Sequence, residues 1–153
     1  MSPTKKESVT GNFSAEERAA MKEYAAELQA EKRRKGSADK AALDVQDLLD
    51  KIAALPDDDR IVAEKVHAII TGAAPELAPK TWYGMPAYYR DGKPIVFFQP
   101  AAKFKARYST LGFNDGAFLD DGAMWPTAYA LTTLGPDEEK KIAELVRRAA
   151  GPS

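Results

Sequence analysis

The chain has 153 residues, of which 44% are hydrophobic and 29% are charged, as expected for one globular domain with its own core. Its formal net charge of −1 provides no overall field that would attract nucleic acid or an anionic membrane, so electrostatic binding must be local. Cysteine is absent, which excludes disulfides, thiolate catalysis and cysteine metal sites. Because His67 is the only histidine, metal sites with two imidazole ligands are excluded as well.

The N-terminal residues give no sign of export or membrane insertion. Residues 1–12, MSPTKKESVTGN, contain no apolar segment of the kind that secretory signals carry, and they are expected to form a disordered tail. No apolar run approaches the roughly 20 residues that a membrane-spanning helix needs. We therefore expect a cytoplasmic protein with no membrane partner.

Residues 13–36 are predicted to form a helix with both ends marked. Ser14 and Glu17 have the spacing of a capping box, and Gly36 provides the stop after a basic run at 32–35. A thin apolar stripe favours an extension that docks on the main domain or reaches a second chain, which would make a homo-oligomer. The stripe consists of Met21, Tyr24, Ala25 and Leu28.

Two further helices are expected to open the main domain, which spans residues 39–151. The first places apolar side chains of residues 44–55 on one face and ends at Pro56. The second begins with Asp57 as its expected N-cap, and Gly72 and Pro75 terminate it. The expected buried positions are Val45, Leu48, Leu49, Ile52 and Leu55 in the first helix, and Val62, Val66, Ile69 and Ile70 in the second.

After residue 80 the pattern changes from helical to strand-like. Residues 81–89 and 94–99 are rich in aromatic and β-branched side chains, and a two-residue Asp-Gly turn is expected to join them. Pro86 has no N–H to donate, so the first strand is expected to bulge there or to run along an edge. Gly84 lets a neighbouring group approach its backbone closely.

Residues 103–113 and 126–134 are predicted to be further strands, and Pro136 begins a C-terminal helix at its first position. The element order is therefore three helices, a run of strands and a last helix. This order predicts an α+β fold: an antiparallel sheet of four to five strands with helices packed on one face, plus an N-terminal helical extension.

The stretch TWYGMPAYYRDGKPIVFF, residues 81–98, is the main candidate for a binding site. Its aromatic side chains would line a pocket that Gly84 and Pro86 hold open. Basic residues at 103, 105 and 107 would share one face of the next strand and supply charge to a small anionic ligand or a protein segment. The candidate ligand-binding residues are Trp82, Tyr83, Gly84, Met85, Pro86, Tyr88, Lys103, Lys105 and Arg107.

The same residues also have a purely structural interpretation. Strands are enriched in aromatic residues, so half of these rings can lie in the core and half on an open sheet face. Alternating charges are also common on the solvated face of a strand. The sequence leaves both interpretations open.

A second candidate site is acidic. Asp44, Asp47 and Asp50 recur every third residue, so neighbours in this series share a helix face, and their oxygen atoms suit a hard cation. The alternative is a solvated helix face, because Asp47 precedes Lys51 by four residues, the spacing of a helical salt pair.

The chain lacks the motifs of the common catalytic classes. It has no Gly-rich phosphate loop, no GxSxG and no catalytic metal-ligand spacing. A non-enzymatic binding module is therefore favoured over an enzyme of unknown reaction, and nucleic acid is not an expected partner.

Several short motifs resemble the YdhG-like bacterial domain of unknown function over roughly residues 44–149. They are Ala-Pro-Glu at 74–76, Trp-Tyr-Gly-Met-Pro-Ala-Tyr at 82–88, Asp-Gly-Lys at 91–93, the pair Phe97-Phe98, and Lys103 or Lys105. The resemblance implies a small α/β sandwich. Some relatives are described as frataxin-like iron chaperones, so an iron chaperone is the alternative function and iron the only implied cofactor. Relatives commonly carry a Lys-His pair after the second strand, where this chain has lysines and Arg107.

Overall fold

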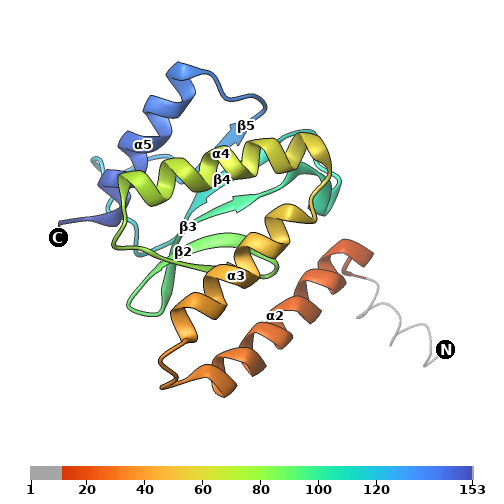
Figure 1. The fold of residues 1–153 in the computed structure, drawn as a ribbon. Helices are drawn as coiled ribbons and strands as arrows, with labels where there is room; N and C mark the ends of the chain where they lie inside the picture. The colour runs from red at the N-terminus through yellow and green to blue at the C-terminus, as the bar shows by residue number, and fades with distance from the viewer. Residues whose placement is uncertain (1–11, 153) are drawn as a thin grey trace.

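A five-stranded antiparallel sheet with the order β1-β2-β3-β4-β5 organises residues 12–152, the part of the chain that the computed structural model describes (Figure 1). The predicted α+β fold is confirmed, whereas the predicted disordered tail lies outside the described residues except for residue 12. In chain order the elements are α2 (Ala15–Arg34), α3 (Lys40–Ala53), α4 (Asp57–Ala73), β1 (Ala78–Trp82), β2 (Met85–Arg90), β3 (Lys93–Gln99), the 3₁₀ helix η1 (Ala101–Phe104), β4 (Ser109–Phe113), β5 (Ala128–Leu131) and α5 (Pro136–Ala150).

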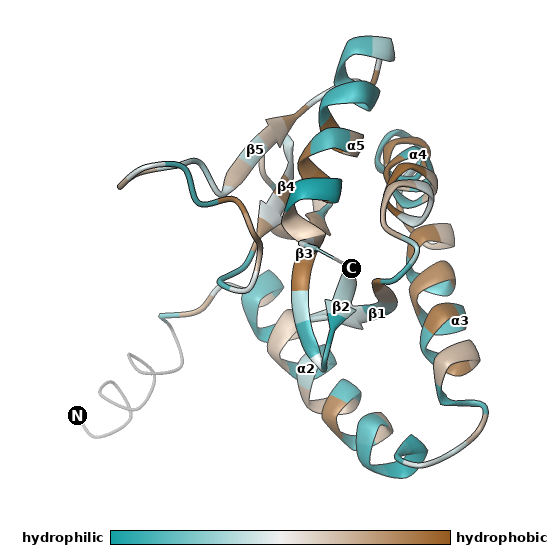
Figure 2. Cartoon of the chain, turned by 90° about the vertical axis from the view of Figure 1, so that its left-hand side faces the viewer, coloured by the Kyte–Doolittle hydropathy of each residue, from teal (hydrophilic) through white to brown (hydrophobic). Residues whose placement is uncertain are grey.

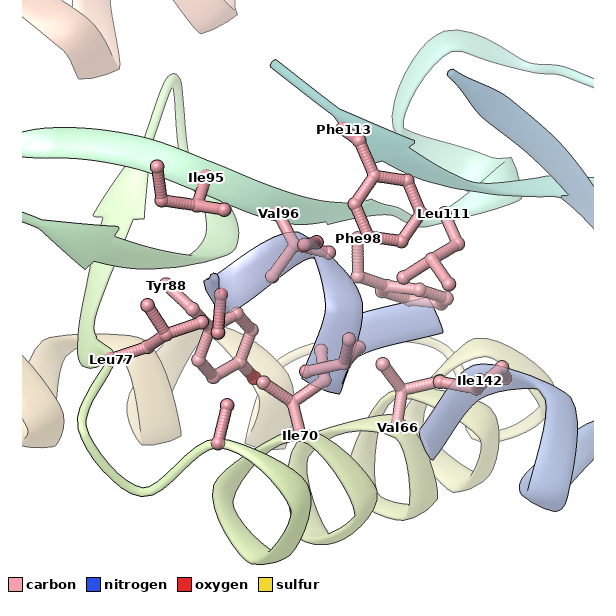
Figure 3. Packing of buried hydrophobic residues seen from close by; sticks show 14 of the residues in the cluster. Val66, Ile70, Leu77, Tyr88, Ile95, Val96, Phe98, Leu111, Phe113 and Ile142 are labelled. Atoms are coloured by element: carbon pink, nitrogen blue, oxygen red, sulfur yellow. The ribbon is translucent and has the colours of Figure 1, made fainter. Parts of the chain in front are cut away.

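The core lies between one face of the sheet and the helices α3, α4 and α5. Tyr88, Val96 and Phe113 are directly opposite one another on β2, β3 and β4, so their side chains point to the same face. Figure 3 shows them packed with side chains of α4 and α5, among them Ile70 and Ile142. Helix α2 runs antiparallel to α3 along the β1 end of the sheet, and Figure 2 shows strands between α2 and the other helices.

Two details of the predicted helices are corrected. In α3 the buried face is Asp44, Leu48 and Ile52, a strict period of four, and the predicted Leu49 is 40% exposed. The face is rotated because Asp44 turns inward to ion partners described below. In α4 the N-cap is Pro56, and Asp57 is already helical and makes no capping bond. Its carboxylate instead adds negative charge to the first turn, where the helix dipole favours it.

The predicted strand 81–89 is two strands. β1 and β2 form a hairpin around a turn at Tyr83-Gly84, and both residues have positive φ, 53° and 77°. This is the backbone that a tight two-residue hairpin turn requires, and it recurs at the predicted Asp91-Gly92 turn. The irregularity expected at Pro86 lies between Tyr88 and Tyr89 instead. β2 is an internal strand that tolerates its proline because its pairing with β3 starts one residue later.

The predicted strand 103–113 begins only at Ser109. Residues 101–104 form η1 after Pro100, and Lys105 adopts a left-handed conformation with φ 54°. Strand alternation therefore does not apply to residues 103–107, and the predicted shared face of Lys103, Lys105 and Arg107 does not exist. β5 and α5 form where expected, with Pro136 at the start of α5.

Among the described residues, no helix combines the length and the apolar composition that a membrane crossing requires.

The core assignment can be tested on α4, which offers a matched pair of isoleucines. Ile70 is fully buried and Ile61 is 47% exposed. Replacing Ile70 by Ala should lower the free energy of unfolding by about 2–5 kcal/mol, because it removes apolar contacts and leaves a cavity. Ile61→Ala should cost well under about 1 kcal/mol. Urea unfolding measures the free energy of unfolding of both variants. Equal losses of this free energy would contradict the packing of the Ile70 face of α4 against the sheet.

Candidate functional site

Helix α2 presents acidic side chains to the rest of the protein. Of its twenty residues only Ala20 is buried, and Leu28 of the predicted apolar stripe is 48% exposed. Glu23, Glu27 and Glu31 recur every four residues and so lie on one side of the helix. Each of the three binds a basic or N–H group outside α2, which makes the contact largely polar.

The centre of this contact is the turn between β1 and β2. The backbone N–H groups of Tyr83 and Gly84 donate to the two carboxylate oxygens of Glu27 at 2.9 and 2.8 Å. The positive φ angles of the turn direct the two successive N–H groups to the same side, and such a pair forms a concave anion site. The predicted close approach to Gly84 is therefore real: a Cβ there would collide with the carboxylate of Glu23.

Lysine side chains lie on both sides of the turn. Lys103 and Lys51 donate to the carboxylate of Glu23 at 2.8 and 2.6 Å. Lys80 of β1 pairs with Glu31 at 2.7 Å. We call the Tyr83-Gly84 turn together with Lys51, Lys80 and Lys103 the α2-facing surface. It is a row of hydrogen-bond donors and positive charges that matches the acidic side of α2.

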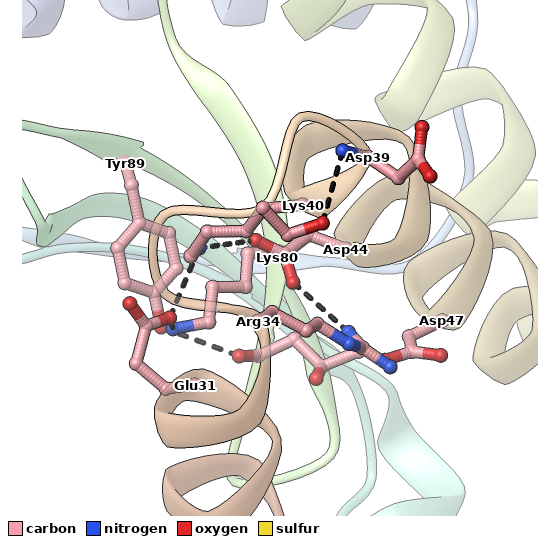
Figure 4. A network of polar contacts seen from close by, with 10 residues as sticks. Glu31, Arg34, Asp39, Lys40, Asp44, Asp47, Lys80 and Tyr89 are labelled. Carbon is pink, nitrogen blue, oxygen red and sulfur yellow. Dashed lines mark hydrogen bonds and ion pairs between the residues drawn. The ribbon is translucent and has the colours of Figure 1, made fainter.

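An ion network around the buried Asp44 fixes the C-terminal end of α2 (Figure 4). Asp44 is 6% exposed, and it accepts from Arg34 of α2 at 3.0 Å and from Lys40 at 2.6 Å. Arg34 also reaches Asp47 at 2.7 Å, and Lys40 pairs with Glu31 at 3.0 Å. A buried carboxylate needs such compensation, so the network explains why Asp44 turns inward.

Aromatic rings extend the contact from α2 to the sheet. Tyr24 stacks on Tyr83 with 4.2 Å between ring centroids and 7° between planes. Trp82 meets Tyr83 edge-on at 5.2 Å and lies against Phe97 of β3 at 5.2 Å. The predicted aromatic stretch thus has one set of rings in the core and another beneath α2.

Clefts open beside the α2 contact. One, with a volume of about 360 Å³, lies between α2 and the β1–β2 hairpin, and Tyr24, Trp82, Tyr89 and Lys80 are among its lining residues. A second, of about 340 Å³, lies between α2, the end of α3 and η1, and includes Gly84, Pro86 and Lys103 in its lining.

The predicted ligand-binding residues therefore do not form one cleft. Trp82 lines the first cleft, whereas Gly84, Pro86 and Lys103 line the second. Met85 and Tyr88 are buried, and the Tyr88 hydroxyl lies 2.9 Å from Nδ1 of His67. Burial raises the pKa of Tyr88 and lowers that of His67. Lys105 and Arg107 are exposed; Lys105 lies 3.4 Å from Glu16, and Arg107 lies over the ring of Tyr108.

The three aspartates of the predicted cation site have other partners. Asp44 and Asp47 share Arg34, and Asp50 accepts a hydrogen bond from Gln46 at 2.8 Å. Within residues 12–152, no three acidic or histidine side chains are grouped so that they could hold a metal ion.

Sequence reasoning missed the residues that make the contact from the α2 side. Glu23, Glu27 and Glu31 carried a usable signal, because their spacing of four marks one helix face. Tyr83 and Gly84 were predicted as binding residues but not as a turn, since tyrosine is unusual at positive φ. Lys80 carried no signal of comparable strength.

Comparison of the chain with family models, with characterised proteins and with solved structures finds no match.

Ion pairing lowers the pKa of two carboxyl groups of α2. For Glu31, hydrogen bonds from Lys80 and Lys40 outweigh burial and hold the pKa below its ordinary value of 4.5. For Glu23, burial is the largest single influence and raises the pKa. Hydrogen bonds and charges from Lys103 and Lys51 together exceed that effect, so the pKa is again lowered.

The lowered pKa values predict a pH dependence of stability. The ionised carboxylates of Glu23 and Glu31 contribute stability above the ordinary pKa of 4.5. This stability is lost as the pH falls through the lowered pKa values of the folded chain. The free energy of unfolding should therefore fall below pH 4.5, and it should fall less in a chain carrying E23Q and E31Q. Urea unfolding from pH 7 downward measures both, and identical profiles would contradict these ion pairs.

The close approach at Gly84 predicts different costs for two similar glycines. Gly84 and Gly92 both have φ 77° and both end a two-residue turn, but a Cβ at Gly92 would meet no atom. Each substitution by Ala should cost about 1–2 kcal/mol for the left-handed backbone. Gly84→Ala should cost more, because the Glu23 carboxylate must leave Lys51 and Lys103. The excess should vanish when Glu23 is also changed to Ala, as a double-mutant cycle can show. If Gly84→Ala still costs more than Gly92→Ala when Glu23 is Ala, the extra cost does not come from the contact with Glu23.

Proposed function

We propose that this protein is a non-enzymatic binding module that holds the carboxylate of a small anionic ligand or of a protein segment at the α2-facing surface. The observation that supports the proposal is the pair of N–H groups of Tyr83 and Gly84, which hold both oxygens of one carboxylate. In the structure this carboxylate belongs to Glu27, so the site already contains an example of the group that it would recognise.

The groups around the turn are suited to recognition. Backbone N–H donors make strong hydrogen bonds to an ionised acceptor, and the turn already holds both N–H groups in position for one carboxylate. Lys103 and Lys80 add positive charge on either side, and the rings of Tyr83 and Trp82 offer apolar contact to the body of a ligand. The resemblance of residues 82–88 to the YdhG-like domain stays a prediction, and this stretch contains the turn.

A chemical-rescue experiment tests the carboxylate site. Glu27→Ala removes the carboxylate and leaves the N–H groups of Tyr83 and Gly84 without this acceptor, so a small free carboxylate should replace it. Sodium propionate at about ten times its dissociation constant should raise the melting temperature of the variant by about 3 °C above matched sodium chloride. Differential scanning calorimetry measures this shift.

The control is Glu64→Ala, which removes a helical glutamate whose side chain is 54% exposed and contacts Arg60. Propionate should not stabilise this variant or the unaltered chain beyond the chloride effect. An equal response of all three chains would refute the carboxylate site.

A further inference from the structure

We infer that the partner of the α2-facing surface is an acidic α-helix of another protein, and that α2 is a built-in competitor for the same surface. This inference rests on the proposed function and specifies the class of ligand. Three observations support it: the spacing of the groups that bind side chains of α2, which we call receptor groups, the geometry of α2, and the polar character of the α2 contact.

The spacing of the receptors matches a helix. Lys103 binds the residue at position 23, the Tyr83-Gly84 turn binds the residue at 27, and Lys80 binds the residue at 31. Carboxylates four residues apart stand about 6 Å apart along one side of an α-helix. A fourth receptor, the buried Asp44, binds an arginine eleven residues after the first glutamate. Together with Asp44, the α2-facing surface therefore selects Glu at positions i, i+4 and i+8 and a basic residue at i+11, presented by a helix.

The attachment of α2 is of a kind that can be exchanged. Its contacts are ion pairs, hydrogen bonds and one ring stack, with Ala20 as its buried residue. Except at the buried Asp44, the ion pairs of α2 are partly exposed, so each contributes little and is screened by salt. A short loop, residues 35–39, joins α2 to α3. A helix on such a tether competes at an effective concentration in the millimolar range, so an outside helix must bind well to displace it.

The inference is tested with a peptide of residues 13–36, blocked at both ends, as the outside helix. It is titrated into the full-length chain and into a full-length chain with E23Q, E27Q and E31Q, whose own α2 competes less. The altered chain should bind the peptide at least about tenfold more tightly than the unaltered chain, because its surface is open for a larger fraction of the time. Fluorescence anisotropy of the labelled peptide gives both dissociation constants.

The matched control is a peptide of identical composition in which the residues at 26 and 27 are exchanged, so that the central glutamate leaves the helix face. It should bind the altered chain at least about tenfold more weakly. If the triple variant does not fold, a chain with E27Q alone serves in its place.

Three results would overturn the inference. They are the absence of peptide binding, equal binding of both peptides, and light scattering that shows the altered chain to be a dimer without peptide, since a second copy would then occupy the surface. If the peptide fails while propionate still stabilises Glu27→Ala, the partner class is wrong and the carboxylate site stands. If both fail, the proposed function fails as well.

Discussion

The left-handed backbone at Tyr83-Gly84 is the constraint on which the arrangement of this molecule depends. Two successive positive φ angles reverse the chain within two residues, so that β1 pairs with β2 and the sheet gains its fifth strand. The same angles direct two backbone N–H groups out of the ladder, where a carboxylate can meet them. The turn thus sets both the edge of the sheet and the position of α2.

The fold is held together by two kinds of contact with different physical sensitivities. The core between the sheet and α3, α4 and α5 is apolar, and burial of its side chains supplies most of the stability. The contact of α2 with the body is mainly electrostatic, so it responds to salt and pH far more than the core does. Conditions that leave the core intact can therefore still loosen α2.

The sequence predicted the elements whose signals are local. Ser14 with Glu17, Pro136, and the Asp91-Gly92 turn each act through neighbouring residues, and all three mark element ends in the structure. Prediction failed where distant residues decide. Glu23 meets Lys103 across eighty positions, and Asp44 turns inward where it meets Arg34 of another helix, ten positions away. At 103–107, alternating charge resembled a strand, although the chain there leaves the 3₁₀ helix η1 through a left-handed Lys105.

The buried Asp44 has a consequence for how α2 lies on the body. Glutamates spaced by four are nearly equivalent after a slide of one helical turn, since each would meet the next receptor along the row. Sliding by one turn would bring Ala30 to the place of Arg34 and leave Asp44 with one cation fewer in a site that excludes most water. Loss of a partner from a buried ion pair is far more costly than loss of an exposed one. The inward-facing Asp44 thus fixes a single register of α2 on the body, although the glutamate contacts alone repeat every helical turn.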